Sequence, residues 1–302
     1  MDTQQRFDDK VVVITGAGSG LGRSYALEFA RRGAKVVVND LGGDVTGGGK
    51  SSAAADAVVQ KIKASGGEAL ASYDSVEDGD AIIQAALDHY GRVDVLVNNA
   101  GILRDSSFKN MSDKDWDLVY RVHLLGSYKV TKAAWPHMLE QGYGRIVNTA
   151  SGAGLYGSFG QANYSAVKMA LVGLTNTLAV EGAAKGIQAN VIAPAAGSRL
   201  TETVFPTEVV SALKPEFITP LVVNLCSESC KESGGLFELG AGWMAKVRWQ
   251  RSMGVNFDVK AGFSAEDVAE SWGEICNFSE FDNPTNISES LTPLLKNVGI
   301  SF

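Results

Sequence analysis

The feature that most constrains the fold is a regular alternation between two apolar patterns over the first two thirds of the chain. Five short runs are nearly continuous in apolar residues, as is typical of strands buried on both faces. The runs are Lys10–Thr15, Lys35–Asp40, Val93–Asn98, Arg145–Ser151 and Gln188–Ala193. The segments between them have helical spacing: Leu21–Arg32, Ser52–Ser65, Asp80–Tyr90, Ser112–Gln141 and Tyr164–Lys185. This alternation predicts an α/β fold with a doubly wound parallel sheet.

Glycine and proline mark the ends of these segments. The chain has 34 Gly but only 7 Pro among 302 residues and no G-X-Y period, which excludes collagen and Pro/Gly-rich disorder. Several glycines lie where a helix-ending residue with positive φ is useful. They are Gly33, Gly66, Gly91, Gly142 and Gly186. Pro136 lies inside the segment Ser112–Gln141, where we expect a kink.

The alternation stops near residue 230. The sequence therefore predicts a nucleotide-binding catalytic core over residues 1–230 and a C-terminal extension over 231–302. Trp243, Trp249 and Trp272 lie in this extension. Such a density of aromatic residues predicts that it packs on the core or on a partner subunit.

Composition excludes several other classes of protein. The net charge is −7, which argues against a nucleic-acid partner. The polar N-terminus does not resemble a secretory signal, and no apolar run approaches the length of a membrane span. Three cysteines favour a reducing compartment without disulfides, and with only three histidines we expect no metal site.

A glycine-rich turn follows the first apolar run. Thr15–Gly22 reads TGAGSGLG and leads into a helix, so its backbone can approach a pyrophosphate at the helix N-terminus. The second run ends in Asp40, twenty residues after Gly20. An acidic side chain at this spacing accepts the ribose hydroxyls of NAD and repels the 2′-phosphate of NADP. The pattern predicts a Rossmann sheet that binds NAD.

Three residues form a candidate catalytic set. Ser151 ends a buried run, and Tyr164 and Lys168 are spaced i, i+4 on one face of a helical segment. A lysine ammonium lowers the pKa of a nearby phenol, which can then accept the proton of a secondary alcohol during hydride transfer. Ser151 would donate a hydrogen bond to the substrate oxygen.

Together these motifs resemble the short-chain dehydrogenase/reductase family. Its pattern combines TGxxxGxG, NNAG, a serine and YxxxK, and here NNAG occupies Asn98–Gly101. The resemblance covers about residues 8–245 and implies that Lys168 also binds the nicotinamide ribose. The cofactor-binding residues that it implies are Gly16, Ser19, Gly20, Leu21, Gly22, Asp40, Asp74, Ser75, Val76, Asn99, Ala100, Gly101, Tyr164, Lys168, Ala196, Gly197, Ser198 and Arg199.

The chain departs from the family pattern at two places. Where many members have an asparagine that supports the lysine through water, this chain has His123. It could hydrogen-bond similarly or titrate, so we expect it to support the catalytic set; the alternative is a satisfied core histidine. Where the family often has Pro-Gly after the sixth strand, this chain has Pro194–Arg199, PAAGSR. We expect the loop that lines the nicotinamide pocket to form by a changed path.

A long insertion narrows the resemblance to one branch. Leu41–Lys50 exceeds the usual strand-to-helix connection of about 2–6 residues. With this insertion and the extension, the chain is similar to the (3R)-3-hydroxyacyl-CoA dehydrogenase units of peroxisomal multifunctional enzymes. The resemblance implies NAD-dependent oxidation of a (3R)-3-hydroxyacyl-CoA to the 3-ketoacyl-CoA in fatty acid β-oxidation. It also implies a homodimer, peroxisomal placement with a cytoplasmic alternative, and fusion to a hydratase domain in a longer chain.

Two other functions stay open from the sequence. One is a dehydrogenase of steroids or other small secondary alcohols, and the other is a nucleotide-binding scaffold without turnover. Basic residues that could meet the CoA phosphates are few, and each is equally typical of an ordinary surface. They are Lys50, Arg104, Lys109 and Arg199.

Overall fold

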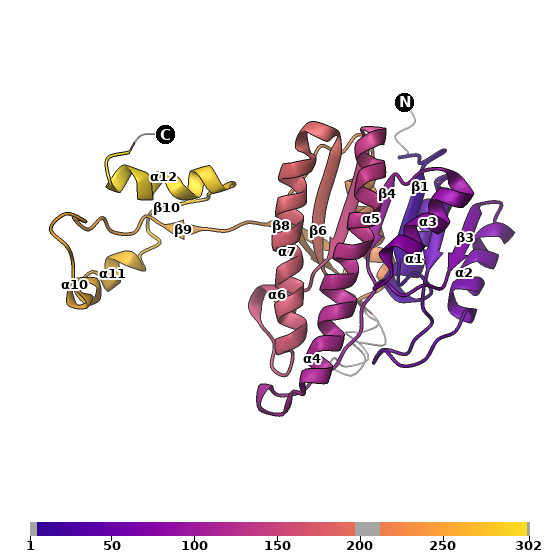
Figure 1. Cartoon of the computed structure of the whole chain (residues 1–302), viewed down its shortest axis with the longest axis horizontal. Helices are drawn as coiled ribbons and strands as arrows, with labels where there is room; N and C mark the ends of the chain where they lie inside the picture. The colour runs from indigo at the N-terminus through magenta and orange to yellow at the C-terminus, as the bar shows by residue number, and fades with distance from the viewer. Residues whose placement is uncertain (1–4, 197–211, 301–302) are drawn as a thin grey trace. The chain divides into compact units, whose positions relative to one another are not determined.

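The computed structural model describes residues 5–196 and 212–300, and these fall into two compact units, Met1–Lys246 and Val247–Phe302 (Figure 1). The first unit runs past residue 230, where the sequence placed the end of the core. It does so because β7 (Leu236–Gly240) pairs in parallel register with β6 (Ile187–Ala195). The residues just after 230 therefore extend the sheet of the core.

The first unit is built on an eight-stranded sheet in the order β3-β2-β1-β4-β5-β6-β7-β8. The remaining strands are β1 (Val11–Thr15), β2 (Lys35–Asn39), β3 (Glu68–Ser72), β4 (Val95–Asn98), β5 (Gly144–Thr149) and β8 (Trp243–Val247). The pairs from β3 through β7 are parallel. The strand order reverses between β1 and β4, and ligands of such sheets bind at the carboxyl ends beside this point. The predicted doubly wound α/β fold is confirmed.

Helices cover both faces of the sheet, and each face has its own buried core. One core contains Phe29, Val58 and Val222, from three helices that lie on the same face. The other contains Ile82 and Val130, on the face that carries α5 and α7. The helices of the first unit are α1 (Gly20–Arg31), α2 (Ala53–Ala64), α3 (Gly79–Tyr90), α4 (Asp113–Tyr120), α5 (Gly126–Gln141), α6 (Gly152–Tyr156), α7 (Ala162–Gly182) and α9 (Thr219–Cys226). Short helical turns are η1 (Phe108–Asn110), η2 (Arg121–Leu125), η3 (Ala183–Lys185) and η4 (Pro215–Phe217).

The segment that was expected to form one helix kinked at Pro136 is divided differently. α5 continues through Pro136, and the irregularity lies earlier, at the π-helical turn η2 between α4 and α5. A π turn inserts one residue into the helix and is frequent at functional sites. It contains His123, which is only 2% exposed.

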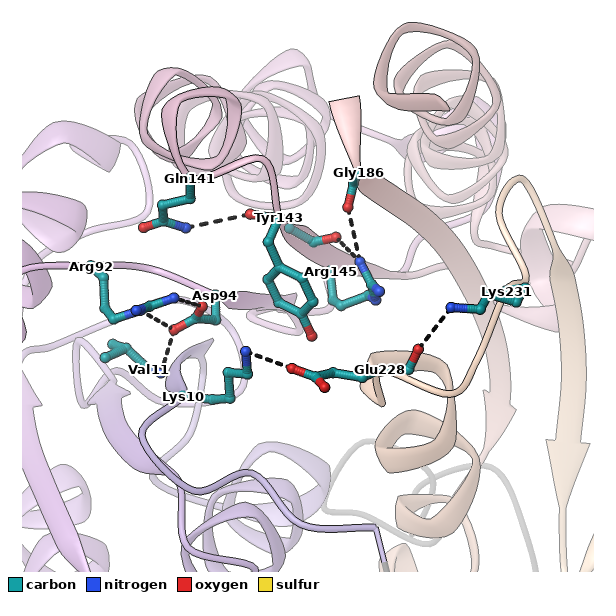
Figure 2. A network of polar contacts seen from close by, with 11 residues as sticks. Lys10, Val11, Arg92, Asp94, Gln141, Tyr143, Arg145, Gly186, Glu228 and Lys231 are labelled. Carbon is teal, nitrogen blue, oxygen red and sulfur yellow. Dashed lines mark hydrogen bonds and ion pairs between the residues drawn. The ribbon is translucent and has the colours of Figure 1, made fainter. Parts of the chain in front are cut away.

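A network of polar side chains closes the amino ends of the strands, opposite the end where ligands bind (Figure 2). Asp94 is buried and accepts hydrogen bonds from the backbone of Val11 and from Nε and Nη2 of Arg92, at 2.6–2.9 Å. The ring of Tyr143 lies between Lys10 and Arg145, each 4.3 Å from its centroid. These contacts tie the starts of β1, β4 and β5 together.

The second unit is small and has little interior. It contains β9 (Arg251–Ser252), β10 (Phe281–Asp282), α10 (Ala265–Glu270), α11 (Trp272–Ile275) and α12 (Ile287–Asn297). Arg251 pairs with Asp282 through two hydrogen bonds of 3.0 and 2.6 Å and donates another to the Ser290 carbonyl. Within residues 247–300 no side chain is buried. The unit's apolar residues therefore remain accessible at its own surface.

Among residues 5–196 and 212–300, no helix is long and apolar enough to cross a lipid bilayer. The same part of the chain has no group of three or more His, Cys, Asp or Glu side chains placed to hold a metal ion.

Candidate active site

A cavity of about 960 Å³ opens at the carboxyl ends of the central strands. Most of the residues predicted from the sequence line it. They are Gly16, Ser19, Gly20, Leu21, Asp40, Asp74, Ser75, Val76, Asn99, Ala100, Gly101, His123, Ser151, Tyr164, Lys168 and Ala196. Gly22 does not line the cavity, and Gly197, Ser198 and Arg199 lie outside the described residues. The fold thus brings together segments that are far apart in the sequence.

The glycine-rich turn between β1 and α1 is closely packed and is hydrogen-bonded to Asn99. A Cβ at Gly22 would lie 2.3 Å from the Gly16 carbonyl oxygen, so only glycine allows this approach. The Asn99 side chain donates hydrogen bonds to the carbonyls of Thr15 and Gly16 at 3.0 and 3.1 Å. The Thr15 hydroxyl in turn accepts from the backbone of Asn99 and Ala100. The NNAG motif therefore shapes the turn as well as lining the cavity.

Asp40 is fixed at the edge of the cavity by two backbone donors. Its two carboxylate oxygens accept hydrogen bonds from Gly18 N at 2.8 Å and Gly42 N at 2.7 Å. A Cβ at Gly18 would lie 2.7 Å from the carboxylate, so this contact also requires glycine. Each carboxylate oxygen has a further acceptor position. The oriented carboxylate and the open N-terminus of α1 fit the ribose and the pyrophosphate of a dinucleotide.

Ser151, Tyr164 and Lys168 meet at the other side of the cavity. Ser151 caps α6, where its hydroxyl accepts a hydrogen bond from Ala153 N at 3.3 Å. Tyr164 and Lys168 lie one turn apart on α7, with the Lys168 Nζ 5.3 Å from the centroid of the phenol ring. Lys168 is 3% exposed and donates to the Thr149 carbonyl at 2.5 Å. This carbonyl is a partner that sequence reasoning missed, because any residue type presents one.

Burial controls the ionisation of this pair. It raises the pKa of the Tyr164 phenol to about 12, although the Ser151 hydroxyl acts in the opposite direction as a hydrogen-bond partner. Burial also lowers the pKa of Lys168 to about 7. The sequence led us to expect a phenol pKa lowered toward neutrality by a lysine cation. In this geometry desolvation outweighs that effect, because it disfavours the charged form of both groups.

His123 packs directly behind the catalytic set. Its Nε2 lies 3.0 Å from the backbone nitrogen of Ile102 and 2.8 Å from the carbonyl oxygen of the same residue, so either tautomer finds a partner there. Its Nδ1 is buried without a hydrogen-bond partner among the described residues. Burial and the neighbouring Lys168 hold the pKa of His123 well below its usual value. The imidazole is therefore neutral at physiological pH.

The candidate CoA-binding cations differ in their surroundings. Lys50 and Lys109 are exposed, and Arg199 lies outside the described residues. Arg104 is half-buried, donates to the Thr46 carbonyl at 2.7 Å and lies 3.5 Å from the Asp115 carboxylate. Of the described candidates, Arg104 is the one whose side chain has a hydrogen bond and an ion pair within the protein.

Comparison with known proteins agrees with the geometry of this cavity. Residues 10–207 match the family described as short chain dehydrogenase. The chain belongs to this family. The matched range contains the glycine-rich turn, Asp40, Ser151, Tyr164 and Lys168, and these are the motifs on which the resemblance was stated.

Two relatives and one solved structure that are similar to this chain are longer than it. Peroxisomal multifunctional enzyme type 2 of Mus musculus is 57% identical over 96% of this chain and 40% of its own length. Peroxisomal hydratase-dehydrogenase-epimerase of Neurospora crassa is 52% identical over 97% of the chain and 33% of its own. The structure of full-length peroxisomal multifunctional enzyme type 2 from Drosophila melanogaster covers 97% of the chain with a TM-score of 0.83 and 42% identity. The chain spans half or less of each of these proteins.

Proposed function

We propose that this protein oxidises the 3-hydroxyl of a (3R)-3-hydroxyacyl-CoA to a 3-ketoacyl-CoA with NAD⁺, as a step of fatty acid β-oxidation. The observation that carries the proposal is one cavity in which Ser151, Tyr164 and Lys168 lie together with a glycine-rich turn and Asp40. The name of the Neurospora crassa relative supports the substrate class, because it joins a hydratase to a dehydrogenase. A hydratase adds water to a double bond, and the hydroxyl so formed is what a dehydrogenase oxidises.

Tyr164 is the proposed base. Its phenolate takes the proton of the substrate hydroxyl, while Ser151 donates a hydrogen bond to the same oxygen as the carbonyl forms. A bound nicotinamide supplies the hydride acceptor. Because burial favours the neutral phenol, Tyr164 can ionise only with a cation beside it, and Lys168 supplies that cation when it is protonated. Because the pKa of Lys168 is about 7, its amine can both carry and release this proton at physiological pH.

NAD is proposed over NADP on the contacts of Asp40. A carboxylate held by Gly18 N and Gly42 N cannot swing away from an incoming 2′-phosphate, and it repels that group. Lys168 is proposed to bind the nicotinamide ribose as well, and His123 is proposed to support Tyr164 through packing. Gly197, Ser198 and Arg199 stay proposed cofactor residues on the family resemblance alone.

The test is NADH formation with the (3R) and (3S) isomers of a medium-chain 3-hydroxyacyl-CoA. We expect turnover of the (3R) isomer, whereas a (3S) preference or no turnover with either isomer contradicts the proposal. A secondary alcohol without pantetheine, such as a hydroxysteroid, serves as the competing substrate. Equal turnover of that alcohol would favour the alternative function, and NAD binding without turnover of any alcohol would indicate a scaffold.

A homodimer is proposed from surfaces of both units. On α7 the residues at spacing i, i+7, i+11 and i+14 are small or apolar and exposed: Ala166, Gly173, Thr177 and Val180. In the second unit, which has no buried residue over the described range 247–300, Trp249 and Trp272 are more than half exposed. Such surfaces are typical of subunit contacts, so we propose that the extension packs on the core or on a partner subunit. Sedimentation equilibrium tests the dimer.

Peroxisomal location and a fused hydratase domain are proposed from the relatives. The names of all three proteins contain the word peroxisomal, and each protein is at least twice as long as the part that matches this chain. Fractionation of cells that express the natural gene product tests the location against the cytoplasmic alternative. Immunoblotting of the same fractions gives the length of the native chain.

A further inference from the structure

A strap of five residues after β4, Ile102–Ser106, connects several parts of the cavity wall. Ser106 N donates to the Gly160 carbonyl at 2.8 Å, and Asp105 accepts from the Gln161 side chain at 2.8 Å. At its other end Ile102 holds His123. The strap therefore contacts both the loop between Ser151 and Tyr164 and the histidine behind them.

The insertion Leu41–Lys50 docks on this strap. The Val45 carbonyl accepts from Leu103 N at 3.0 Å, and the Thr46 carbonyl accepts from Arg104 Nε at 2.7 Å. A Cβ on Gly47 would lie 3.2 Å from the Ile102 side chain, so the insertion packs closely there. The insertion is thus a fixed part of the wall.

Asp44 shapes the turn that presents these carbonyls. One of its carboxylate oxygens accepts from Thr46 N, the Thr46 hydroxyl and Gly48 N, at 2.7–3.0 Å. These bonds lower the pKa of Asp44 to about 2, and the Arg104 cation adds to the effect. At neutral pH the turn is therefore held by a full negative charge.

The backbone of Arg104 faces the catalytic helix. The Arg104 carbonyl accepts from the side chain of Asn163 at 3.1 Å, and Asn163 is 1% exposed. The side-chain oxygen Oδ1 of Asn163 accepts from Tyr164 N at 2.8 Å. Arg104 also lies 3.5 Å from Asp115 at the start of α4, and Asn163 approaches the carbonyl of that residue at 3.4 Å. One chain of contacts thus runs from the insertion to Tyr164.

We infer that Arg104 is a positioning residue, which ties the 41–50 insertion to Asn163 and so fixes the Tyr164 phenol relative to Ser151. This role rests on the proposed function, and it assigns to Arg104 a task other than binding CoA phosphates. A small displacement of a catalytic group lowers the rate of the chemical step more than it weakens binding. The two roles therefore predict different kinetics.

The experiment compares Arg104→Ala and Arg104→Lys with the wild type on two substrates. One is a (3R)-3-hydroxyacyl-CoA, and the other is the N-acetylcysteamine thioester of the same acid, which has no phosphates. We expect Arg104→Ala to lower kcat about tenfold with both substrates and to change each KM by less than about threefold. Arg104→Lys keeps a cationic donor near Thr46 and Asp115, so it should recover most of kcat. Lys114→Ala removes an exposed cation of α4 as the matched control and should leave kcat unchanged.

A second variant tests the path through the insertion. Asp44→Ala should lower kcat in the same direction, and the double variant should lose little more than Arg104→Ala alone, because both changes break one chain of contacts. The inference is overturned by a KM increase confined to the CoA thioester, by a kcat within about twofold of wild type, or by an Arg104→Lys variant as slow as Arg104→Ala. If the wild type itself oxidises neither thioester, the proposed function fails, and the inference fails with it; this result is seen before any variant is measured.

Discussion

The ring of His123 meets the ring of Tyr164 edge to face, with centroids 5.3 Å apart and planes at 88°. His123 comes from the π turn η2 and Tyr164 from the first turn of α7, so two separate elements fix this contact. The imidazole is anchored to the backbone of Ile102 and cannot turn away without losing that hydrogen bond. Its position therefore limits where the phenol can lie.

Gly101→Ala tests this contact without changing either ring. A Cβ at Gly101 would lie 2.5 Å from the His123 Cε1, so either the imidazole that contacts Tyr164 or the backbone must move. We expect kcat to fall about 10- to 100-fold, because a displaced base loses rate quickly. Steady-state kinetics at saturating NAD⁺ measure the effect. Gln60→Ala, at an exposed position of α2 that does not line the cavity, is the control; an unchanged kcat in Gly101→Ala would contradict the role of the contact.

Tyr164→Phe tests the base directly. The change removes one hydroxyl and leaves the packing against His123 in place. We expect turnover to fall by at least about 10²-fold, while the Kd of NAD⁺ changes little, since only the transferable proton is lost. Rapid-mixing kinetics and fluorescence titration with the cofactor measure the two quantities. Activity that survives the change would show that another group is the base.

The sequence alone predicted the fold well where burial decides the pattern. β1, β2, β4, β5 and β6 lie in runs that are apolar on both faces, and such runs have few alternatives to a central strand. β3 (EALAS) was not recognised as an apolar run, because a short mixed run does not distinguish strand from helix. The π turn at His123 was missed, because its single extra residue leaves no periodic signal.

The motifs also predicted most of the residues that line the cavity, because the glycine-rich turn, Asp40, the NNAG motif and Ser151 lie at the carboxyl ends of strands. The motifs could not predict the contacts that hold these residues in position. Arg104 meets Thr46 and Asn163 across 58 and 59 residues of sequence, and neither contact has a spacing rule. The motifs also could not predict the pKa values of Tyr164 and Lys168, because these values depend on burial rather than on the i, i+4 spacing.

Asp40→Asn tests the choice of cofactor. The amide keeps one acceptor oxygen and a similar shape but removes the charge that repels a 2′-phosphate. We expect KM for NAD⁺ to rise about tenfold, as one charged hydrogen bond is lost, and KM for NADP⁺ to fall. The ratio of kcat/KM for the two cofactors measures the change. A ratio that stays at the wild-type value would mean that Asp40 does not face the ribose.

Lys168→Met tests the buried amine through stability as a function of pH. The pKa of Lys168 is about 7 in the folded protein and about 10.4 in an unfolded chain, so between these values only the unfolded chain holds the proton. The free energy of unfolding of the wild type should therefore rise with pH over this window, by up to about 1.4 kcal/mol per unit from this group. Tyr164, with a raised pKa of about 12, lowers stability only above pH 10, and His123 acts only below the window.

The variant lacks the amine and should lose this part of the slope. Lys168→Met is thus expected to be more stable than the wild type near pH 7, with a difference that shrinks toward pH 10. Urea denaturation at pH 7, 8 and 9 measures both curves. Parallel curves would contradict a neutral, buried Lys168. Lys185→Met is the control, because Lys185 is exposed and its substitution should not change the slope.

Tyr143→Phe tests the network at the opposite end of the sheet. The Tyr143 hydroxyl is buried and has no hydrogen-bond partner among the described residues, while the ring faces Lys10 and Arg145. Removing an unpaired buried hydroxyl relieves its desolvation, so we expect the free energy of unfolding to stay equal or to rise by about 1 kcal/mol. Tyr143→Leu removes the ring that both cations contact and should cost about 1–3 kcal/mol. Urea denaturation at pH 7 compares the two variants; a destabilised Tyr143→Phe would mean that the hydroxyl is bonded, and an unaffected Tyr143→Leu would mean that the ring contacts contribute no stability.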